Sequence, residues 1–190
     1  MSSVSSLEGW NERLVDQLVF HWDHHLRPRL DGLTDDEYRW EPVPGCWGVR
    51  PRAEARAELV GGRGDVVWEY EFPEPDPVPV TTIAWRLAHL IVQVFGERNH
   101  NHFGGPEIRF MTHDYAATAT AALAQLDDGY RRWIDRCRSL GPAGLARPVG
   151  EAEGPFAASP YADLILHINR EVIHHGAEIL TLRDLYRTGP

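Results

Sequence analysis

Four segments of the sequence carry apolar residues at helical spacing, and this repeated pattern constrains the fold more than any other feature. The segments are residues 6–30, 81–103, 114–139 and 160–187. Apolar residues that recur every three or four positions line one face of an amphipathic helix, which must be buried against a neighbour. A chain of 190 residues is long enough for one such core. We therefore predict an all-α fold, a four-helix bundle in a single domain that spans residues 1–190.

The residues that open these segments favour helix starts. Ser6, Thr81 and Asp114 are of capping types, and Pro160 is tolerated in a first turn. The segment 81–103 is apolar on more than one side through its middle. We expect this second helix to be central and largely buried.

A long interval, residues 31–80, separates the first two predicted helices. It contains a glycine turn within AELVGGRGDVVWEYEF, which indicates a short hairpin, and the proline-rich run PEPDPVPV. One explanation for its length is a crossover connection that lets the first and second helices run in the same direction. Another is that the interval forms the wall or lid of a site, with Trp47 as an apolar wall residue.

Charge and composition argue against several classes of function. The formal net charge of -9 disfavours binding to the phosphate backbone of nucleic acids, which requires a surface rich in Lys and Arg. No stretch approaches the ~18 apolar residues of a membrane span, and the amino-terminal residues lack the pattern of a secretory signal. We therefore expect a cytoplasmic protein with no nucleic-acid or membrane partner, in which Cys46 and Cys137 are free thiols.

The last predicted helix contains NREVIHHGAEI, residues 169–179, which is unusually rich in groups that hold protons or metals. Glu171 and His175 are four residues apart, so they share one helix face and can reach the same ion. His174 points about a quarter-turn away. His167 and Glu178 lie within one broad face that includes Glu171, so spacing alone does not choose the ligands.

The second predicted helix offers a facing ligand. His89 lies in AWRLAHLIVQVF, the most apolar part of that helix, where a buried imidazole needs a partner. Metal sites in helical bundles take ligands from facing helices. A His, Glu, His set suits Zn²⁺ and also accommodates Fe²⁺, Ni²⁺ or Mn²⁺. The residues thus favour a metal site of His89, Glu171 and His175 with an open position, and the alternative is a buried hydrogen-bond network without metal.

Other polar residues compete with this set. The group His21, His24 and His25 is interleaved with charged residues, which favours a solvated face. His100 and His102 lie near a helix end, where a cation is favoured by the helix dipole.

Two further observations bear on the chemistry. Cys46 lies between turn residues and a tryptophan, where its thiol either faces a pocket or has a structural role. The sequence contains no nucleophile elbow, no phosphate-binding glycine loop and no dinucleotide-binding fingerprint.

The pairing of TTIAWRLAHL with NREVIHHGAEILTLRDLY, on the second and fourth predicted helices, resembles the DinB-like superfamily and in particular its actinobacterial branch. The stretch HWDHHLRPRLDGLTDDEYRWEPVPGCWGVRP is also similar to that branch, so the resemblance covers nearly the whole chain. It implies a four-helix bundle with a crossover connection, in the order up-down-down-up, and a divalent metal near one end.

The resemblance also implies a ligand set. The family uses a His on the second helix and an H-x-x-x-H pair on the last, which fall here on His89, Glu171 and His175. Glutamate in place of the first His of the pair is a departure, and it is similar to the His-Glu-His arrangement of the mycothiol-dependent maleylpyruvate isomerase branch.

The function implied by this resemblance is that of a metal-dependent enzyme. Characterised relatives use the metal to bind or activate a low-molecular-weight thiol, so we expect activation of a mycothiol-like thiol, or of water, for S-transfer, isomerisation or hydrolysis of a small molecule. We expect His174 to act as a catalytic residue that moves protons, with His167 or Glu178 as alternatives. The rival hypothesis is a non-catalytic, stress-related bundle that binds a metal or a ligand. Exposed glutamates and arginine-rich ends leave room for a homodimer.

Overall fold

The structure is a computed structural model that describes residues 9–189, so Ser6, the expected first cap, lies outside the described residues. Helix α1 spans Trp10–His21 and continues through a π-helical turn at Trp22–Leu26 and a 3-10 turn at Pro28–Leu30. From residue 10 onward, the first predicted helix is therefore confirmed, with irregular turns at its carboxyl end.

Helices α3 (Ile83–His89) and α4 (Glu97–Phe103) form one continuous rod, with a π-helical segment at Leu90–Gly96 between them. The side chain of Thr82 caps the start of the rod by accepting a hydrogen bond from the backbone N–H of Trp85. Nearly every side chain of the π-helical segment is buried. The second predicted helix is therefore confirmed, and it is as central as its apolar middle indicates.

Helix α5 spans Ala119–Arg138 and begins later than the expected residue 114. The Thr118 side chain caps it by accepting a hydrogen bond from the backbone N–H of Ala121. Asp114 instead forms an exposed ion pair with Arg63 at 3.1 Å. The expected start at Asp114 is wrong because this carboxylate is used by a distant arginine rather than by the helix.

Helix α7 spans Tyr161–Thr188 and follows Pro160, as predicted. Between α5 and α7 lie the short helix α6 (Gly141–Ala146) and a 3-10 segment at Glu151–Phe156. Helix α2 (Asp35–Arg39) begins the interval between α1 and α3, with a capping box between Thr34 and Glu37.

A small antiparallel sheet occupies the rest of that interval. Strands β2 (Leu59–Gly61) and β3 (Val66–Tyr70) form the predicted hairpin, and β1 (Val49–Pro51) pairs with the other edge of β3 to give the order β1-β3-β2. The hairpin is confirmed, whereas the third strand was not predicted. The fold is therefore helix-rich with a small sheet rather than purely α-helical.

Contacts between distant residues give the directions of the long helices. The Asn169 amide donates to the carbonyl of Leu14 at 2.8 Å, and Arg29 pairs with Asp184, so numbers rise together along α1 and α7 and these helices are parallel. Helix α5 is antiparallel to α1. Asn11, at the start of α1, donates to the carbonyl of Arg138 at the end of α5, whereas Arg27, just beyond α1, pairs with Asp127 in the middle of α5.

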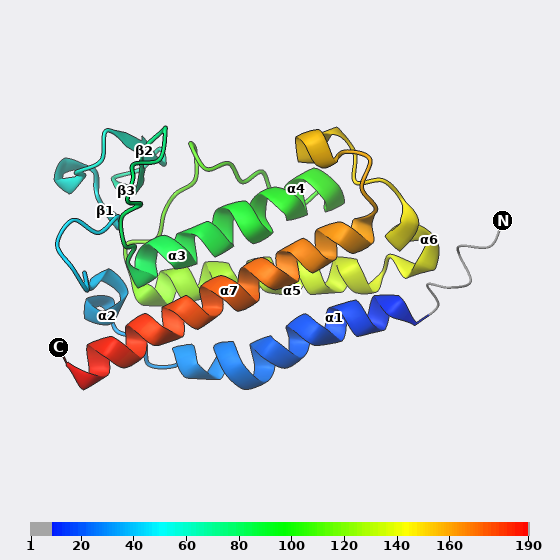
Figure 1. Ribbon diagram of the computed structural model, residues 1–190, viewed down its shortest axis with the longest axis horizontal. Coiled ribbons are helices and arrows are strands. Elements are labelled where there is room, and N and C mark those ends of the chain that lie inside the picture. The colour runs from blue at the N-terminus through cyan, green and yellow to red at the C-terminus, as the bar shows by residue number, and fades with distance from the viewer. Residues whose placement is uncertain (1–8, 190) are drawn as a thin grey trace.

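The α3–α4 rod runs against α7, since Arg86 pairs with Glu178 while His89 faces Glu171. Helices α1 and α3 are therefore antiparallel, and the expectation that the first two helices run in the same direction is wrong. Figure 1 shows the physical reason: the interval 31–80 remains at the end of the molecule where α1 finishes and α3 begins. The connection that returns the chain along the helices is residues 104–118, between α4 and α5.

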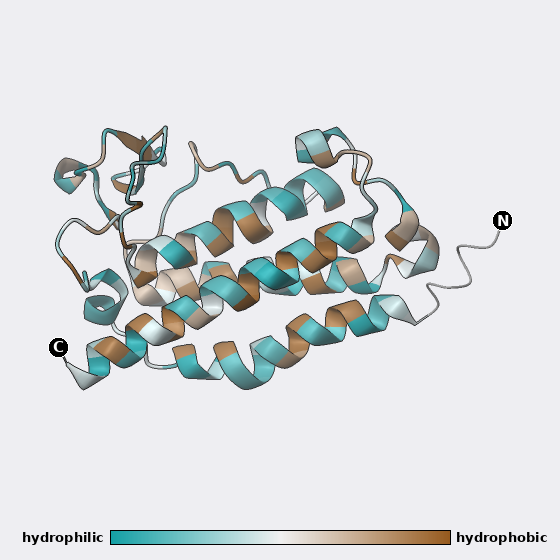
Figure 2. Ribbon diagram, in the orientation of Figure 1, coloured by the Kyte–Doolittle hydropathy of each residue, from teal (hydrophilic) through white to brown (hydrophobic). Residues whose placement is uncertain are grey.

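The core lies between these helices. Trp22 and Tyr130 stack with ring centroids 3.8 Å apart, and the rings of Phe95 and Trp133 are fully buried beside them. Figure 2 shows hydrophobic and hydrophilic bands alternating along the long helices, as expected for helices that bury one side. Within the described part of the chain, no helix is long and apolar enough to cross a membrane.

Candidate metal centre

The three residues predicted as metal ligands come together between α3 and α7. His89 is the last residue of α3, and Glu171 and His175 lie one turn apart on α7. The Glu171 Oε2 atom is 3.5 Å from His175 Nε2 and 4.0 Å from His89 Nε2. One ligand atom from each residue lies within 4.8 Å of the other two, so all three can contact one ion.

The outer nitrogens of both imidazoles have hydrogen-bond partners. His89 Nδ1 is bonded to the side-chain oxygen of Gln93, which lies four residues later in the π-helical segment. His175 Nδ1 is 2.8 Å from Glu178 Oε2. With an acceptor oxygen beside each Nδ1, the Nε2 atoms of both rings face Glu171, which is the arrangement that metal-binding histidines adopt.

Glu171 presents its two oxygens differently. Oε2 faces the two imidazoles, while Oε1 lies 3.5 Å from both His167 Nδ1 and the Arg170 guanidinium. These outer contacts are too long to be strong hydrogen bonds. The carboxylate is therefore oriented by its neighbours, and Oε2 remains available as a ligand.

Burial sets the charge state of His89. Burial, together with repulsion by His175, lowers the His89 pKa to about 4, so the ring is neutral at pH 7. Trp85 stacks on this ring with centroids 5.9 Å apart. Trp47 stacks on Trp85 at 6.4 Å, so the wall beside His89 is Trp85 and the expected wall residue Trp47 lies behind it.

The donor set fits a divalent cation. Two imidazole nitrogens and one carboxylate oxygen are ligands that Zn²⁺ and its neighbours in the first transition row accept. The side chains of His89, Glu171 and His175 retain 21%, 23% and 15% of their exposure. Solvent therefore reaches the cluster, and a three-ligand site at this position keeps room for an exchangeable ligand.

A second group of possible ligands overlaps the first. His174, His175 and Glu178 also have ligand atoms within 4.8 Å of one another. His174 Nε2 is 3.5 Å from Glu178 Oε1, and its side chain is 63% exposed. His174, Glu178 and Arg86 line a shallow cavity of about 420 Å³ beside the cluster. This position is accessible to solutes, and the role of His174 as a catalytic residue stays a prediction.

The competing histidines of the sequence lie elsewhere. His24 and His25 are exposed, as expected for a solvated face, whereas His21 is partly buried and its Nε2 atom is not exposed to solvent. The expectation that His102 serves the helix end is wrong: its side chain is 1% exposed, Nε2 is 2.8 Å from a Glu153 oxygen and Nδ1 is 3.1 Å from the hydroxyl of Tyr161. Sequence spacing gave no signal for these partners because both lie on a distant segment.

Both cysteines are free thiols and both are buried, which confirms the predicted redox state. The Cys46 thiol donates to the carbonyl of Val43 at 3.0 Å, and burial raises its pKa. Burial also raises the pKa of Cys137. These contacts support the structural reading of Cys46 rather than a thiol that faces the cluster.

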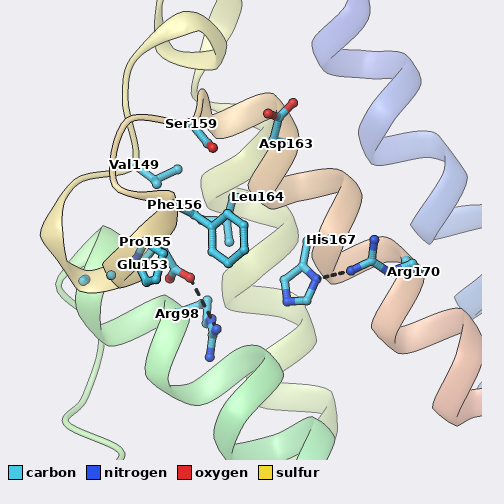
Figure 3. Close-up of a pocket in the computed structure, with 12 residues that line it drawn as sticks. Arg98, Val149, Glu153, Pro155, Phe156, Ser159, Asp163, Leu164, His167 and Arg170 are labelled. Carbon is cyan, nitrogen blue, oxygen red and sulfur yellow. Dashed lines mark hydrogen bonds and ion pairs between the residues drawn. The ribbon is translucent and has the colours of Figure 1, made fainter.

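A larger cavity, of about 740 Å³, lies on the other side of the cluster along α7. Figure 3 shows Arg98 from α4, Phe156 from the 3-10 segment, and His167 and Arg170 from α7 around it. His167 joins this cavity to the cluster through its contact with Glu171. Sequence reasoning noted His167 as a possible partner and missed the cavity, because the segments that line it are far apart along the chain.

The fold and the cluster define a helical domain with a solvent-accessible His-Glu-His centre between two helices. The family model of the DinB superfamily matches residues 17–179, and the chain belongs to that superfamily. This membership indicates a metal-binding helical domain, consistent with the cluster of possible ligands. Comparisons with curated proteins and with solved structures gave no match.

Proposed function

We propose that this protein is a metal-dependent enzyme in which His89, Glu171 and His175 hold one divalent ion, with Zn²⁺ favoured over Ni²⁺, Fe²⁺ or Mn²⁺. The observation that carries the proposal is the orientation of the two imidazoles. Each is fixed through Nδ1, by Gln93 or Glu178, so that both Nε2 atoms face the same carboxylate oxygen.

The proposal includes the finer architecture, a four-helix bundle in the order up-down-down-up that belongs to the actinobacterial branch. The helix directions support this order, because α1 is parallel to α7 while the α3–α4 rod and α5 run the other way. The His-Glu-His set supports the branch, since it resembles the arrangement in mycothiol-dependent maleylpyruvate isomerases.

The proposed reaction is S-transfer, isomerisation or hydrolysis of a small molecule, with a mycothiol-like thiol or water as the nucleophile. When bound, the ion supplies a Lewis acid that favours the deprotonated form of that nucleophile. The chain's own residues orient and shield it: Trp85 covers one face of His89 and limits water there. His174, exposed next to Glu178, is placed to exchange a proton with solvent and is the proposed proton-moving residue.

A non-catalytic metal-binding or ligand-binding bundle is the second candidate. A structural metal site is closed by four protein ligands, whereas a catalytic site leaves a position open. Here three side chains form the group and retain partial exposure, with cavities on either side along α7. These features favour the enzyme.

The metal content of the purified protein tests the first half of the proposal. Elemental analysis after incubation with Zn²⁺ is expected to give about one ion per chain in the wild type and almost none in His89→Ala and Glu171→Gln. His25→Ala, which changes an exposed histidine outside the group, is the matched control. Circular dichroism verifies that each variant is folded. Stoichiometric metal in Glu171→Gln would overturn the assignment.

The second half is tested with the loaded protein. Mycothiol, bacillithiol and a thiol-free reaction are each combined with a panel of electrophiles, maleylpyruvate among them, and with small esters and amides. We expect turnover that disappears in Glu171→Gln, falls in His174→Ala and persists in His25→Ala. A protein that binds metal and catalyses none of these reactions supports the non-catalytic candidate.

A further inference from the structure

The larger cavity has the features of a built binding site. It lies between α4, the 3-10 segment Glu151–Phe156 and the first turns of α7, and its volume of about 740 Å³ is in the range of small-molecule sites. Figure 3 shows that the side chains of Arg98, Phe156 and His167 converge on it.

Arg98 contributes a guanidinium group in which one hydrogen-bond donor has no acceptor. Its Nη1 donates to the carbonyl of Gln93 at 2.6 Å, and its Nη2 lies 3.4 Å from Glu153 Oε2. The Nε atom is buried and has no hydrogen-bond partner. A buried donor that lacks an acceptor costs about 1–3 kcal/mol, which a ligand acceptor would recover.

The acidic residue nearest to Arg98 is held by other side chains. Glu153 is 10% exposed, and its second oxygen is 2.8 Å from Nε2 of the buried His102. The hydroxyl of Tyr161 lies 3.1 Å from the other nitrogen of that ring and fixes its orientation. Glu153 therefore serves as a structural anchor of Arg98, with both carboxylate oxygens contacted by the protein.

The α7 side of the cavity adds two more donors. An N–H of Arg170 donates to His167 Nδ1 at 2.6 Å, so the proton of that ring is on Nε2. The Arg170 side chain is 70% exposed, which leaves other guanidinium N–H groups available. Asp163 is the opposing charge: it lines the cavity one and two turns before these residues and is exposed.

The remaining wall is apolar. Val149, Pro155 and Leu164 line it, and the Phe156 ring is 68% exposed at its rim. Together these side chains give the cavity a contiguous apolar surface that an apolar group can contact. Donors from both α4 and α7, together with an apolar wall, select a molecule with an anionic group and a hydrophobic body.

We propose that this cavity binds a small organic carboxylate with an aromatic or aliphatic body, its carboxylate near Arg98 and Arg170 and its body against Phe156. His167 contacts both the cavity and Glu171, at 3.5 Å, so a ligand seated here lies next to the metal centre. The cavity is then the substrate site of the enzyme, and this second statement rests on the proposed function.

The test is a fluorescence titration with 1-anilinonaphthalene-8-sulfonate, an aromatic anion, followed by competition. Displacement by 4-phenylbutyrate is expected at concentrations at least about tenfold lower than by uncharged 4-phenylbutyramide, because one charge-assisted contact is worth about that factor. Equal displacement by the acid and the amide overturns the proposal.

Exposed positions supply the variants, so folding is not at risk. Phe156→Ala is expected to weaken 4-phenylbutyrate binding by about tenfold and Arg170→Gln by about threefold, while Asp163→Asn strengthens it by about twofold. Arg131→Gln, an exposed arginine on α5, is the matched control and should change nothing. Unchanged binding in both Phe156→Ala and Arg170→Gln overturns the proposal.

The same titration separates this proposal from the metal centre. Glu171→Gln and chelator-treated protein should retain 4-phenylbutyrate binding, because the contacts come from the cavity. If the wild-type protein takes up no metal and still binds 4-phenylbutyrate, only the proposed function is refuted. Binding that vanishes with the metal assigns the anion to the ion itself and refutes the cavity as its site.

Discussion

His175 belongs to both groups of possible ligands, and the effect of Glu178→Gln on zinc affinity distinguishes them. In the proposed centre, Glu178 is the hydrogen-bond partner of His175 and would not be a ligand of the ion. In the alternative group, Glu178 and His174 are ligands themselves. The two assignments predict different rankings of the loss in zinc affinity when these residues are changed.

The size of the expected loss follows from the contact. Removing a hydrogen-bond partner of a metal-binding histidine typically costs about 10–100-fold in affinity. The Glu178 carboxylate accepts the Nδ1 proton of His175 at 2.8 Å, and the amide oxygen of glutamine can still accept it. Its side chain is also 31% exposed, so solvent screens its charge. We therefore expect a loss at the low end, about tenfold or about 1.4 kcal/mol.

Zinc affinities are measured by competition with a chromophoric chelator at fixed pH and ionic strength. Glu171→Gln, which removes a ligand oxygen and its charge, should lose more than the ~100-fold limit for a hydrogen-bond partner. His174→Ala should remain within about twofold of the wild type, because its exposed ring is not part of the centre. The opposite result would assign the ion to the alternative group: Glu178→Gln and His174→Ala would each lose more than ~100-fold in zinc affinity, while Glu171→Gln would bind zinc normally.

Four further predictions concern the scaffold. Glu37→Ala should lower the free energy of unfolding by about 3–5 kcal/mol in urea titrations, because it leaves the buried guanidinium of Arg183 without its carboxylate; a loss below about 1 kcal/mol would contradict this. Hydrogen bonds to Thr34 and Arg183 lower the pKa of Glu37 despite its burial, so its contribution is complete above the usual glutamate pKa of about 4.3 and is lost as the pH falls through the lowered value; the difference between wild type and Glu37→Ala should shrink in acid. Trp133→Ala should cost about 3–5 kcal/mol by opening a core cavity, which calorimetry measures as a lower melting temperature. Cys46 and Cys137 should react with a thiol reagent only after unfolding, since burial raises both thiol pKa values; rapid labelling of the native protein would refute this.

The ligand cluster was predictable because its geometry is mostly local. Glu171 and His175 are neighbours on any helix, and His89 stood out as a lone imidazole in an apolar helical segment. The helix ranges followed from periodicity, and the hairpin from its glycine turn. The exposed His174 was placed next to the cluster by the same local rule.

The errors and omissions share a cause, which is dependence on distant contacts. The expectation that the first two helices run in the same direction was wrong because nothing in residues 31–80 reveals that the interval folds at one end of the molecule. His102 looked like a helix-end cation, and its partners Glu153 and Tyr161 are 51 and 59 residues away along the chain. The cavity could not be predicted, because the segments that line it, in α4, the 3-10 segment and α7, come together only in the tertiary structure.

The π-helical segment Leu90–Gly96 has a consequence for how this scaffold diversifies. It separates His89, which faces the metal cluster, from Arg98, which faces the cavity, on a single rod. A π-helical turn holds one residue more than an α-helical turn, so deleting one residue here would restore a plain helix and leave both flanking parts of the rod facing as they do now. If the segment instead became α-helical with its length unchanged, the rod beyond it would rotate by about 100° relative to His89, and a different side chain would replace Arg98 at the cavity. A substitution that removes the π-helical turn is thus a route by which a relative keeps its metal ligands and changes what it binds.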